Sequence, residues 1–313
     1  MKTKISKPII KHLLDFETLS PEEILYLLNQ ANKFATLSQS GGTTNSMHTD
    51  KVCMNLFYEP STRTQYSFNI AAQKLGINCI NPNMLTLSDK KGESLIDTVH
   101  AFEAMGVNLF IIRHKDNHTP HFISAELNSS CSIINAGDGT NQHPSQTIID
   151  LMTIQQSLQR LSDLTVAIIG DISHSRVAHS FLAAADTLQL GQINLIGPAS
   201  FIPDNMNYNI PISVHTDLDA GLEGADVVMA LRIQSERMDQ NNLPDMESYT
   251  NQYALTQNRM LKAKDSAIIL HPGPMVRGTE IDSITADSEQ SKILQQVKNS
   301  TYARMAILDA LLN

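Results

Sequence analysis

The segment Ser61–Thr64 combines three hydroxyl groups and one guanidinium in four consecutive residues. It follows the apolar run 52–57 and precedes a helical pattern with apolar side chains three and four residues apart. A helix N-terminus has unpaired N–H groups and a partial positive charge, and hydroxyl and guanidinium donors add to both. The segment therefore predicts a compact site for a phosphate group.

By itself, the same segment is also compatible with an ordinary helix start, in which Ser61 is the N-cap and Arg63 is solvated. The apolar strand before it and the arginines after other strands favour the phosphate site. The chain contains no G-x-x-x-x-G-K-[ST] sequence, so a P-loop for ATP or GTP is disfavoured.

Polar residues also follow the other apolar runs of the chain. In open α/β sheets, ligands bind outside the carboxyl ends of the strands, so these positions are candidate binding residues. They are Arg113, Gly137, Asp138, His143, Gln146, Asp171, Ser175, Arg176, Arg232, Gln234, His271 and Pro274. A chance scatter would place most of the arginines on helix exteriors.

The apolar runs indicate parallel sheets covered on both faces, because each run is continuous and helical patterns separate them. The runs are residues 52–57, 109–112, 132–136, 165–169, 193–196, 226–231 and 267–270. A helical stretch at 144–161 divides them into two groups. We therefore expect an α/β protein of two domains, each a parallel β-sheet flanked by helices. The expected domains are residues 1–155 and 156–313, with a C-terminal helix at about 291–312 that packs back on the body.

The composition agrees with this class. The chain has 313 residues, enough for about two domains, and its 23 Lys and Arg against 32 Asp and Glu give a net charge of −9. That balance argues against nucleic acid or an anionic membrane surface as a partner. No apolar run approaches the ~18 residues of a membrane span, and the N-terminus lacks the apolar core of a signal peptide. Three dispersed cysteines predict no disulfide framework, so we expect a cytoplasmic protein.

Four segments together resemble the aspartate/ornithine carbamoyltransferase family, and within it the aspartate carbamoyltransferase catalytic chains. They are FYEPSTRTQYSF, GDGTNQHPSQTIIDLMTI, LRIQSERM and HPGPMVRGTEI, in the order and spacing of that family. The Arg-x-Gln at 232–234 and Pro272 after His271 favour the aspartate branch, since the ornithine branch is expected to carry an H-C-L-P segment there.

The resemblance implies transfer of the carbamoyl group of carbamoyl phosphate to the α-amine of L-aspartate, an early step of pyrimidine biosynthesis, with no cofactor. The residues implied to bind carbamoyl phosphate are Ser61, Thr62, Arg63, Thr64, Arg113, His143, Gln146 and Pro274. Those implied to bind the aspartate carboxylates are Arg176, Arg232 and Gln234. Glu59 is implied to bridge the domains by pairing with Arg176 and Arg237.

These residue types suit the reaction. When the amine attacks the carbonyl carbon, negative charge develops on the carbonyl oxygen, and Thr64, Arg113 and His143 are the donors expected to stabilise it. Loss of one such donor typically costs ~3 to 4 kcal/mol. No covalent nucleophile is required, and the departing phosphate can accept the amine proton, so no protein base is assigned.

Simpler interpretations of two of these residues stay open. His143 also fits an ordinary helix N-terminus, with Pro144 at the first helical position. Arg232 also fits a surface ion pair with Glu236 four residues later.

The resemblance further implies a homotrimer in which a neighbouring subunit supplies a serine and a lysine to each active site. Lys91 fits the K-G-E pattern, but the position of the usual serine holds Leu87. Ser88 lies one residue late, so either the loop shifts by one residue and Ser88 replaces the serine, or a backbone group or the hydroxyl of Thr86 does. A solvated loop lysine is the alternative for Lys91. A regulatory chain or dihydroorotase is a possible partner.

Three histidines raise the question of a metal site. The spacing of His114, His118 and His121 also fits a polar helix face before Pro120 interrupts it, and no carboxylate cluster accompanies them, so we expect no metal. Two alternative functions stay open: a carbamoyltransferase for ornithine or another amine, and a non-catalytic assembly chain.

Overall fold

The computed structural model describes residues 8–83, 92–128, 130–237 and 245–313. The chain forms two compact units. The first contains Met1–Met152 and Lys298–Asn313, and the second contains Thr153–Val297. Two helices, α5 (Pro144–Leu158) and α11 (Ile293–Leu312), pass from one unit to the other. The C-terminal helix is therefore shared between the units, with its last fifteen or so residues in the first.

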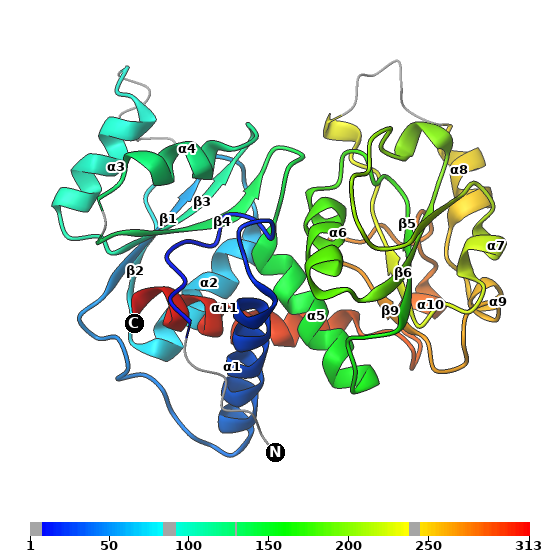
Figure 1. The fold of residues 1–313 in the computed structure, drawn as a ribbon, viewed down its shortest axis with the longest axis horizontal. Coiled ribbons are helices and arrows are strands. Elements are labelled where there is room, and N and C mark those ends of the chain that lie inside the picture. Colours follow the sequence, from blue (N-terminus) through cyan, green and yellow to red (C-terminus); the bar gives the residue numbers. More distant parts are fainter. Residues whose placement is uncertain (1–7, 84–91, 129, 238–244) are drawn as a thin grey trace. The chain divides into compact units, whose positions relative to one another are not determined.

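The first unit has a parallel sheet in the order β2-β1-β3-β4 (Figure 1). Its strands are β1 (Val52–Phe57), β2 (Asn78–Ile80), β3 (Leu109–His114) and β4 (Ser132–Asp138). From β1 the chain first adds β2 on one side and then β3 and β4 on the other. The order therefore reverses between β1 and β3, and this is the point where α/β sheets bind ligands.

Helices cover both faces of this sheet. They include α1 (Pro21–Gln39), α2 (Thr62–Leu75), α3 (Leu95–Ala104) and α4 (Thr119–Glu126). In Figure 1, α3 and α4 lie on one face, and α1, α2 and α11 lie on the other. A capping box begins α1, because Ser20 Oγ accepts from the N–H of Glu23 while Glu23 accepts from the N–H of Ser20. Gly76 caps the C-terminus of α2, and its φ of 80° favours glycine.

The second unit has a five-stranded parallel sheet in the order β7-β6-β5-β8-β9. Its strands are β5 (Leu164–Ile169), β6 (Gly191–Ile196), β7 (Ile212–His215), β8 (Val227–Ala230) and β9 (Ile268–Leu270). The strand order reverses between β5 and β8, so this sheet has the same kind of switch point as the first.

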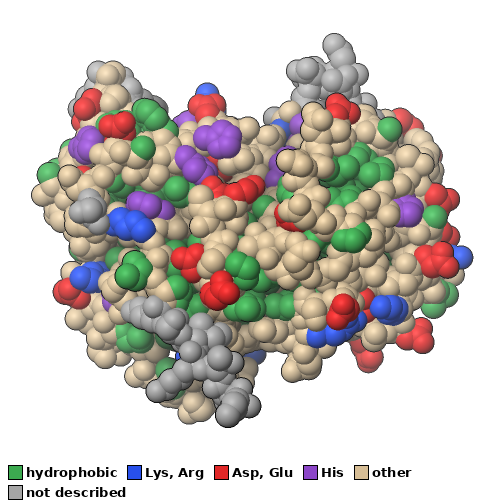
Figure 2. Space-filling view, viewed as in Figure 1, with side chains coloured by type: hydrophobic (Ala, Val, Ile, Leu, Met, Phe, Trp, Pro, Cys, Tyr) green, Lys and Arg blue, Asp and Glu red, His purple; other side chains and the backbone are tan. Residues whose placement is uncertain are grey.

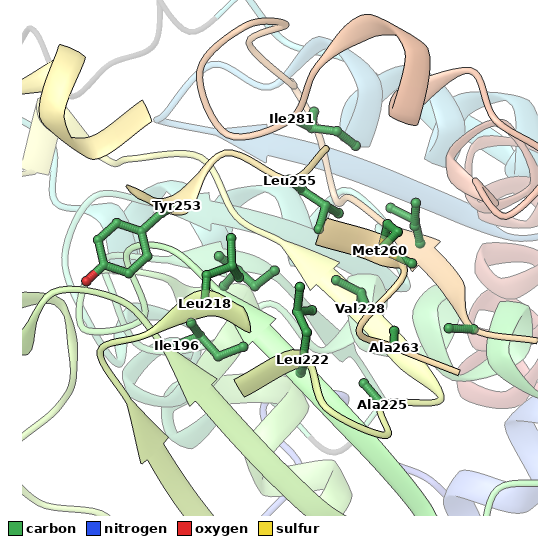
Figure 3. Close-up of a cluster of buried hydrophobic side chains, with 14 of the residues drawn as sticks. Ile196, Leu218, Leu222, Ala225, Val228, Tyr253, Leu255, Met260, Ala263 and Ile281 are labelled. Atoms are coloured by element: carbon green, nitrogen blue, oxygen red, sulfur yellow. The ribbon is translucent and has the colours of Figure 1, made fainter. Parts of the chain in front are cut away.

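The helices of the second unit are short apart from α6 (Arg176–Leu188). The others are α7 (Leu218–Leu222), α8 (Met246–Tyr253), α9 (Gln257–Met260) and α10 (Ser283–Ala286), with 3-10 turns η2 (Ala199–Phe201) and η3 (Ser235–Arg237). Figure 3 shows the core on one face of this sheet, where Ile196 and Val228 of the strands meet Leu218, Leu222 and Met260 of α7 and α9. Burial of such aliphatic side chains is the main stabilising contribution to this unit.

The expected fold class, two helix-flanked parallel sheets with a C-terminal helix, is confirmed. All seven predicted strands are present, but β3 and β4 extend two residues further, so Arg113 and Asp138 belong to strands. Two strands were not predicted, β2 and β7. Both lie at sheet edges and are half exposed, so they lack a continuous apolar run. Among the described residues, no helix has both the length and the apolar character needed to cross a membrane.

Candidate active site

The switch point of the first sheet carries the predicted phosphate segment and Arg113. Phe57, the last residue of β1, pairs in register with Arg113 of β3, and the N–H of Tyr58 donates to the carbonyl of Arg113 at 2.9 Å. The chain then runs from Tyr58 to the start of α2 at Thr62. Arg113 and the N-terminus of α2 therefore lie at the same edge of the sheet.

The first turn of α2 is arranged to bind an anion. Ser61 is the N-cap, but among the described residues its side chain caps no N–H and instead its Oγ donates to Thr64 Oγ1 at 3.0 Å. Thr64 is buried, whereas Thr62 is exposed and the Arg63 side chain is exposed over part of its surface. Partial burial lowers the pKa of the Arg63 guanidinium from its ordinary value, and a guanidinium keeps its charge at neutral pH. The uncapped N–H groups and this cation favour phosphate.

Acceptors in the same unit hold the Arg113 side chain. Its guanidinium donates to the carbonyl of Ala136 in β4 at 3.2 Å and forms an ion pair with Glu59. These contacts fix a cation beside the α2 N-terminus. The bridge implied between Glu59 and two arginines, Arg176 and Arg237, would join the two units, and it stays a prediction.

His143 and Gln146 follow the last strand of the same sheet. The ring of His143 is buried, with 5% of its surface exposed, and Ser145 Oγ lies 3.5 Å from Nδ1. The amide nitrogen of Gln146 donates to Asp150 Oδ1 at 2.8 Å. The burial of His143 differs from the solvated side chain of an ordinary surface helix start, because a buried imidazole can serve as a donor in a water-poor site.

Asp138 organises the turn that leads to His143, a role that sequence reasoning did not assign. Its carboxylate is fully buried and accepts from the side chains of Asn135 at 2.8 Å and Asn141 at 3.0 Å. It also accepts from the N–H groups of Gln142 at 3.1 Å and His118 at 2.6 Å. The pattern G-D-G after a strand was the available signal, but these partners come from two segments of the chain.

The switch point of the second sheet carries Arg176, Arg232 and Gln234. Arg176 is the first residue of α6, after β5, and only 3% of its surface is exposed. Arg232 follows β8 and donates to the carbonyl of Ile233 at 2.9 Å and to Gln234 Oε1 at 3.4 Å. Strands β5 and β8 pair directly, so these three residues lie at one edge of the sheet.

Asp171 joins the two loops at this edge. Its buried carboxylate accepts from the ring nitrogen of His174 at 2.8 Å and, through the other oxygen, from the N–H of Gln234 at 3.1 Å. Arg237 in turn donates to the carbonyl of His174 at 3.0 Å. These contacts hold the loops that carry the cations in fixed positions.

The segment after β9 is organised by His271 and Glu280. The N–H of Gly273 donates to His271 Nδ1 at 2.8 Å, so Nε2 carries the proton that it shares with Glu280 Oε1 at 3.0 Å. The same carboxylate oxygen accepts from the N–H of Val276 at 2.6 Å. Both side chains are buried. Glu280 thus fixes the loop around Pro274, which follows a cis peptide bond.

The predicted site residues therefore fall into two groups. The first-unit cluster consists of residues 61–64, Arg113, His143 and Gln146. The second-unit cluster consists of Arg176, Arg232 and Gln234, with Pro274 in the same unit. Lys91, Ser88, Leu87 and Thr86 lie outside the described residues, and so does the side chain of Glu236, the alternative partner of Arg232.

The histidines expected to form a polar face do meet a carboxylate. One potential ligand atom each from His118, His121 and Asp138 lies within 4.8 Å of the other two. His114 is not part of this group, and its Nδ1 accepts from the N–H of Asp116 at 3.0 Å. Figure 2 shows histidine side chains gathered on this surface of the first unit. The sequence pattern did not predict that one carboxylate, that of Asp138 at the end of β4, lies beside two of these histidines at the start of α4.

Two family models match the chain, one after the other along the sequence. A model of the aspartate/ornithine carbamoyltransferase carbamoyl-P binding domain matches residues 11–156. A model of the aspartate/ornithine carbamoyltransferase Asp/Orn binding domain matches residues 162–311.

Individual relatives agree with these matches. The aspartate carbamoyltransferase catalytic subunit of Legionella pneumophila is 44% identical over 303 residues, covering 97% of this chain and 99% of the relative. Among solved structures, the catalytic subunit of M. jannaschii aspartate transcarbamoylase has a TM-score of 0.85 at 32% identity, covering 97% of this chain and 98% of that one. Aspartate transcarbamoylase of Trypanosoma cruzi, in complex with carbamoyl phosphate and aspartate, has a TM-score of 0.87 at 25% identity, with 97% of each chain covered.

Proposed function

The chain belongs to the aspartate/ornithine carbamoyltransferase family, and we propose that its two clusters divide the binding of the two substrates between them. The reaction is transfer of the carbamoyl group from carbamoyl phosphate to the α-amine of L-aspartate, which gives N-carbamoyl-L-aspartate and phosphate. The observation that carries the division is that each sheet has its own switch point and each switch point holds cations. Both substrates are anions, so each finds a complementary group of donors.

In this proposal, the first-unit cluster binds carbamoyl phosphate. The phosphate lies on the N–H groups of the first turn of α2, with the hydroxyls of residues 61–64 and the Arg63 cation around it. Thr64, Arg113 and His143 donate to the carbonyl oxygen, and Gln146 contacts the carbamoyl amino group. The ion pair of Arg113 with Glu59 supports this role, since a positioned cation needs no reorganisation when charge develops.

The second-unit cluster binds the aspartate carboxylates, with Arg176, Arg232 and Gln234 as donors. The neutral α-amine attacks the carbonyl carbon, a C–N bond forms, and the C–O bond to phosphate breaks. The amine proton passes to the departing phosphate. Much of the rate comes from holding the two anions in the attacking geometry. Residues 1–155 are then the carbamoyl phosphate domain and residues 156–313 the aspartate domain, with the loop at Pro274 completing the carbamoyl pocket.

The proposal extends to assembly and cellular role. Lys91 in its K-G-E sequence supports a homotrimer with shared active sites, to which a neighbouring subunit contributes Lys91 and either Ser88 or Thr86. The activity supports a place in pyrimidine biosynthesis in the cytoplasm. A regulatory chain or dihydroorotase is a candidate partner, and a mass-spectrometric measurement of complexes purified from cells would identify either one.

A side-by-side assay tests the activity. Purified protein is given carbamoyl phosphate with either aspartate or ornithine, and release of phosphate and formation of the carbamoylated amino acid are measured. We expect turnover with aspartate. Turnover with ornithine alone would instead establish the other branch of the family. If the protein bound neither carbamoyl phosphate nor a phosphonate–aspartate bisubstrate mimic, it would be a non-catalytic chain.

A further inference from the structure

We propose that His118, His121 and Asp138 of the first unit form a binding site for a divalent metal ion, with zinc as the metal that suits the donors best. One ligand atom from each residue lies within 4.8 Å of the other two. Three donors bound to one zinc ion at about 2.0–2.2 Å lie within about 4 Å of one another. Small side-chain rotations are therefore enough to close the site.

The fold brings these three residues together through two neighbouring elements. Asp138 is the last residue of β4, and His118 is the N-cap of α4, with His121 in the first turn. The N–H of His118 donates to Asp138 Oδ2 at 2.6 Å, which fixes the start of the helix against the end of the strand. The two imidazole rings stand edge to face, with centroids 5.6 Å apart.

The backbone of His118 gives an independent indication. Its φ is 59°, in the left-handed region that a residue with a Cβ adopts only at a cost of about 1–2 kcal/mol. That conformation places His118 beside the carboxylate of Asp138. Strain of this kind is common at ligand sites, where the surrounding contacts maintain it.

His121 already has the partner that metal-bound histidines usually have. Its Nε2 lies 2.5 Å from Asp15 Oδ2, and the other oxygen of Asp15 accepts from the N–H and hydroxyl of Thr18 at 2.8 and 2.7 Å. A carboxylate that accepts from one ring nitrogen orients the ring and makes the other nitrogen a better ligand. Asp15 therefore acts as a positioning residue for His121.

The other nitrogen of that ring lacks a partner. Nδ1 of His121 is buried, and the residues that the structure describes offer it no hydrogen bond. An unsatisfied buried polar atom of this kind costs about 1–3 kcal/mol. A metal ion bound to Nδ1 removes that cost, so the ring has a carboxylate on one side and a coordination position on the other.

The surrounding charge and the donor types select the class of ion. Asp15, Asp138 and Glu17 lie around His121, and Glu17 is held by the Gln142 amide at 2.5 Å. Two imidazoles and one carboxylate suit zinc and similar transition metals better than magnesium or calcium, which prefer oxygen ligands. With three protein ligands, a fourth position stays open for water.

Metal binding requires one local exchange. The oxygens of Asp138 accept four hydrogen bonds, which use the carboxylate's ordinary acceptor positions. Three of these come from backbone groups or from buried Asn135, and the fourth comes from the side chain of Asn141 at 3.0 Å. The Asn141 amide is the contact that can turn away, so the ion replaces it on Oδ2.

The test measures zinc binding to the full chain. Protein stripped of metal with a chelator is titrated with Zn²⁺ against a chromophoric chelator. We expect one site per chain, with affinity at least tenfold weaker in His118→Asn and His121→Gln and about 10–100-fold weaker in Asp15→Asn. His118→Asn is the decisive variant, because His118 is exposed and asparagine tolerates a left-handed backbone.

Two control variants sharpen the result. His100→Asn removes another partly exposed histidine of the same unit, and we expect unchanged affinity. Asn141→Ala removes the contact that the ion displaces, and we expect equal or tighter binding. Zinc should also raise the Tm of the wild-type chain and of His100→Asn but not of His118→Asn. Absence of zinc binding, or equal affinity in wild type and His118→Asn, would overturn the proposal.

Discussion

Arg63 is the residue on which the phosphate assignment depends most directly. Much of its side chain is exposed, and among the described residues it forms no ion pair that folding would lose. We therefore predict that Arg63→Ala lowers kcat by about 10²–10³-fold or more while the free energy of unfolding stays unchanged, since it removes a transition-state donor. Steady-state kinetics and urea unfolding measure the two effects. Lys74→Ala, at the opposite end of the same helix, is the matched control, and near-normal turnover in Arg63→Ala would refute the assignment.

Replacing Glu280 should lower the stability of the folded chain, and it should also release the loop at Pro274. In Glu280→Ala, the N–H of Val276 and the ring of His271 lose a shared buried acceptor. An unpaired buried donor costs about 1–3 kcal/mol, so we predict a loss of that order in the free energy of unfolding. Glu280→Gln keeps an acceptor oxygen and should lose less. Urea unfolding of the three proteins measures this, and equal stability of Glu280→Ala and wild type would contradict the geometry.

The N-terminal segment shows how an element protects a sheet edge. Strand β4 is the last strand of the first sheet, and Leu13 lies along it, donating to the carbonyl of Ile133 and accepting from Asn135, both at 2.8 Å. The ring of His12 adds to this contact, because its Nδ1 accepts from the N–H of Ile133 at 3.1 Å. Unpaired edge groups favour aggregation, so this segment both stabilises and shields β4.

This contact makes the first unit sensitive to acid. Burial, together with the neighbouring Lys11 charge, lowers the pKa of His12 from 6.5 to about 4. Between these values the unfolded chain binds the proton and the folded chain does not, so His12 causes stability to fall as the pH drops from 6.5 to about 4. Below that range its contribution is constant. His12→Gln keeps a neutral acceptor, and we predict a smaller fall in its urea midpoint between pH 7 and pH 4.5. Equal falls in both proteins would count against this.

Strands that form a continuous, buried apolar run could be predicted from the sequence. Short or exposed strands could not. Strands such as β1 and β5 are mostly apolar and mostly buried, and the predicted Ser61 and Arg176 lie at the starts of the helices that follow them. Edge strands β2 and β7 are short and half exposed, so no periodicity marks them. The residues proposed to contact the substrates lie in recognisable sequence motifs. Their supports, such as Asp171 and Glu280, depend on contacts between distant segments, which no local pattern encodes.

At the scale of the whole molecule, the charge of −9 and the two anionic substrates are compatible because the charges are separated. Cations lie at the switch points of the two sheets, where Arg113 is close to the end of β3 and Arg232 follows β8. Many carboxylates lie on the surface, as Figure 2 shows for one face. Local fields at a site decide the binding of small anions, whereas the net charge acts mainly on large polyanions and is screened beyond about 10 Å.

The assembly itself can be tested by complementation between inactive chains. If each active site takes Arg63 from one subunit and Lys91 from its neighbour, Arg63→Ala and Lys91→Ala are each inactive alone. In trimers formed at random from equal amounts of both, a site is complete when its own chain carries Arg63 and its neighbour carries Lys91. Each condition holds for half of the chains, so about a quarter of the sites should be active in a closed ring. Recovery near this fraction of wild-type kcat supports shared sites. Subunit exchange is verified by native mass spectrometry. If activity does not recover after exchange, Lys91 does not act in the active site of a neighbouring subunit.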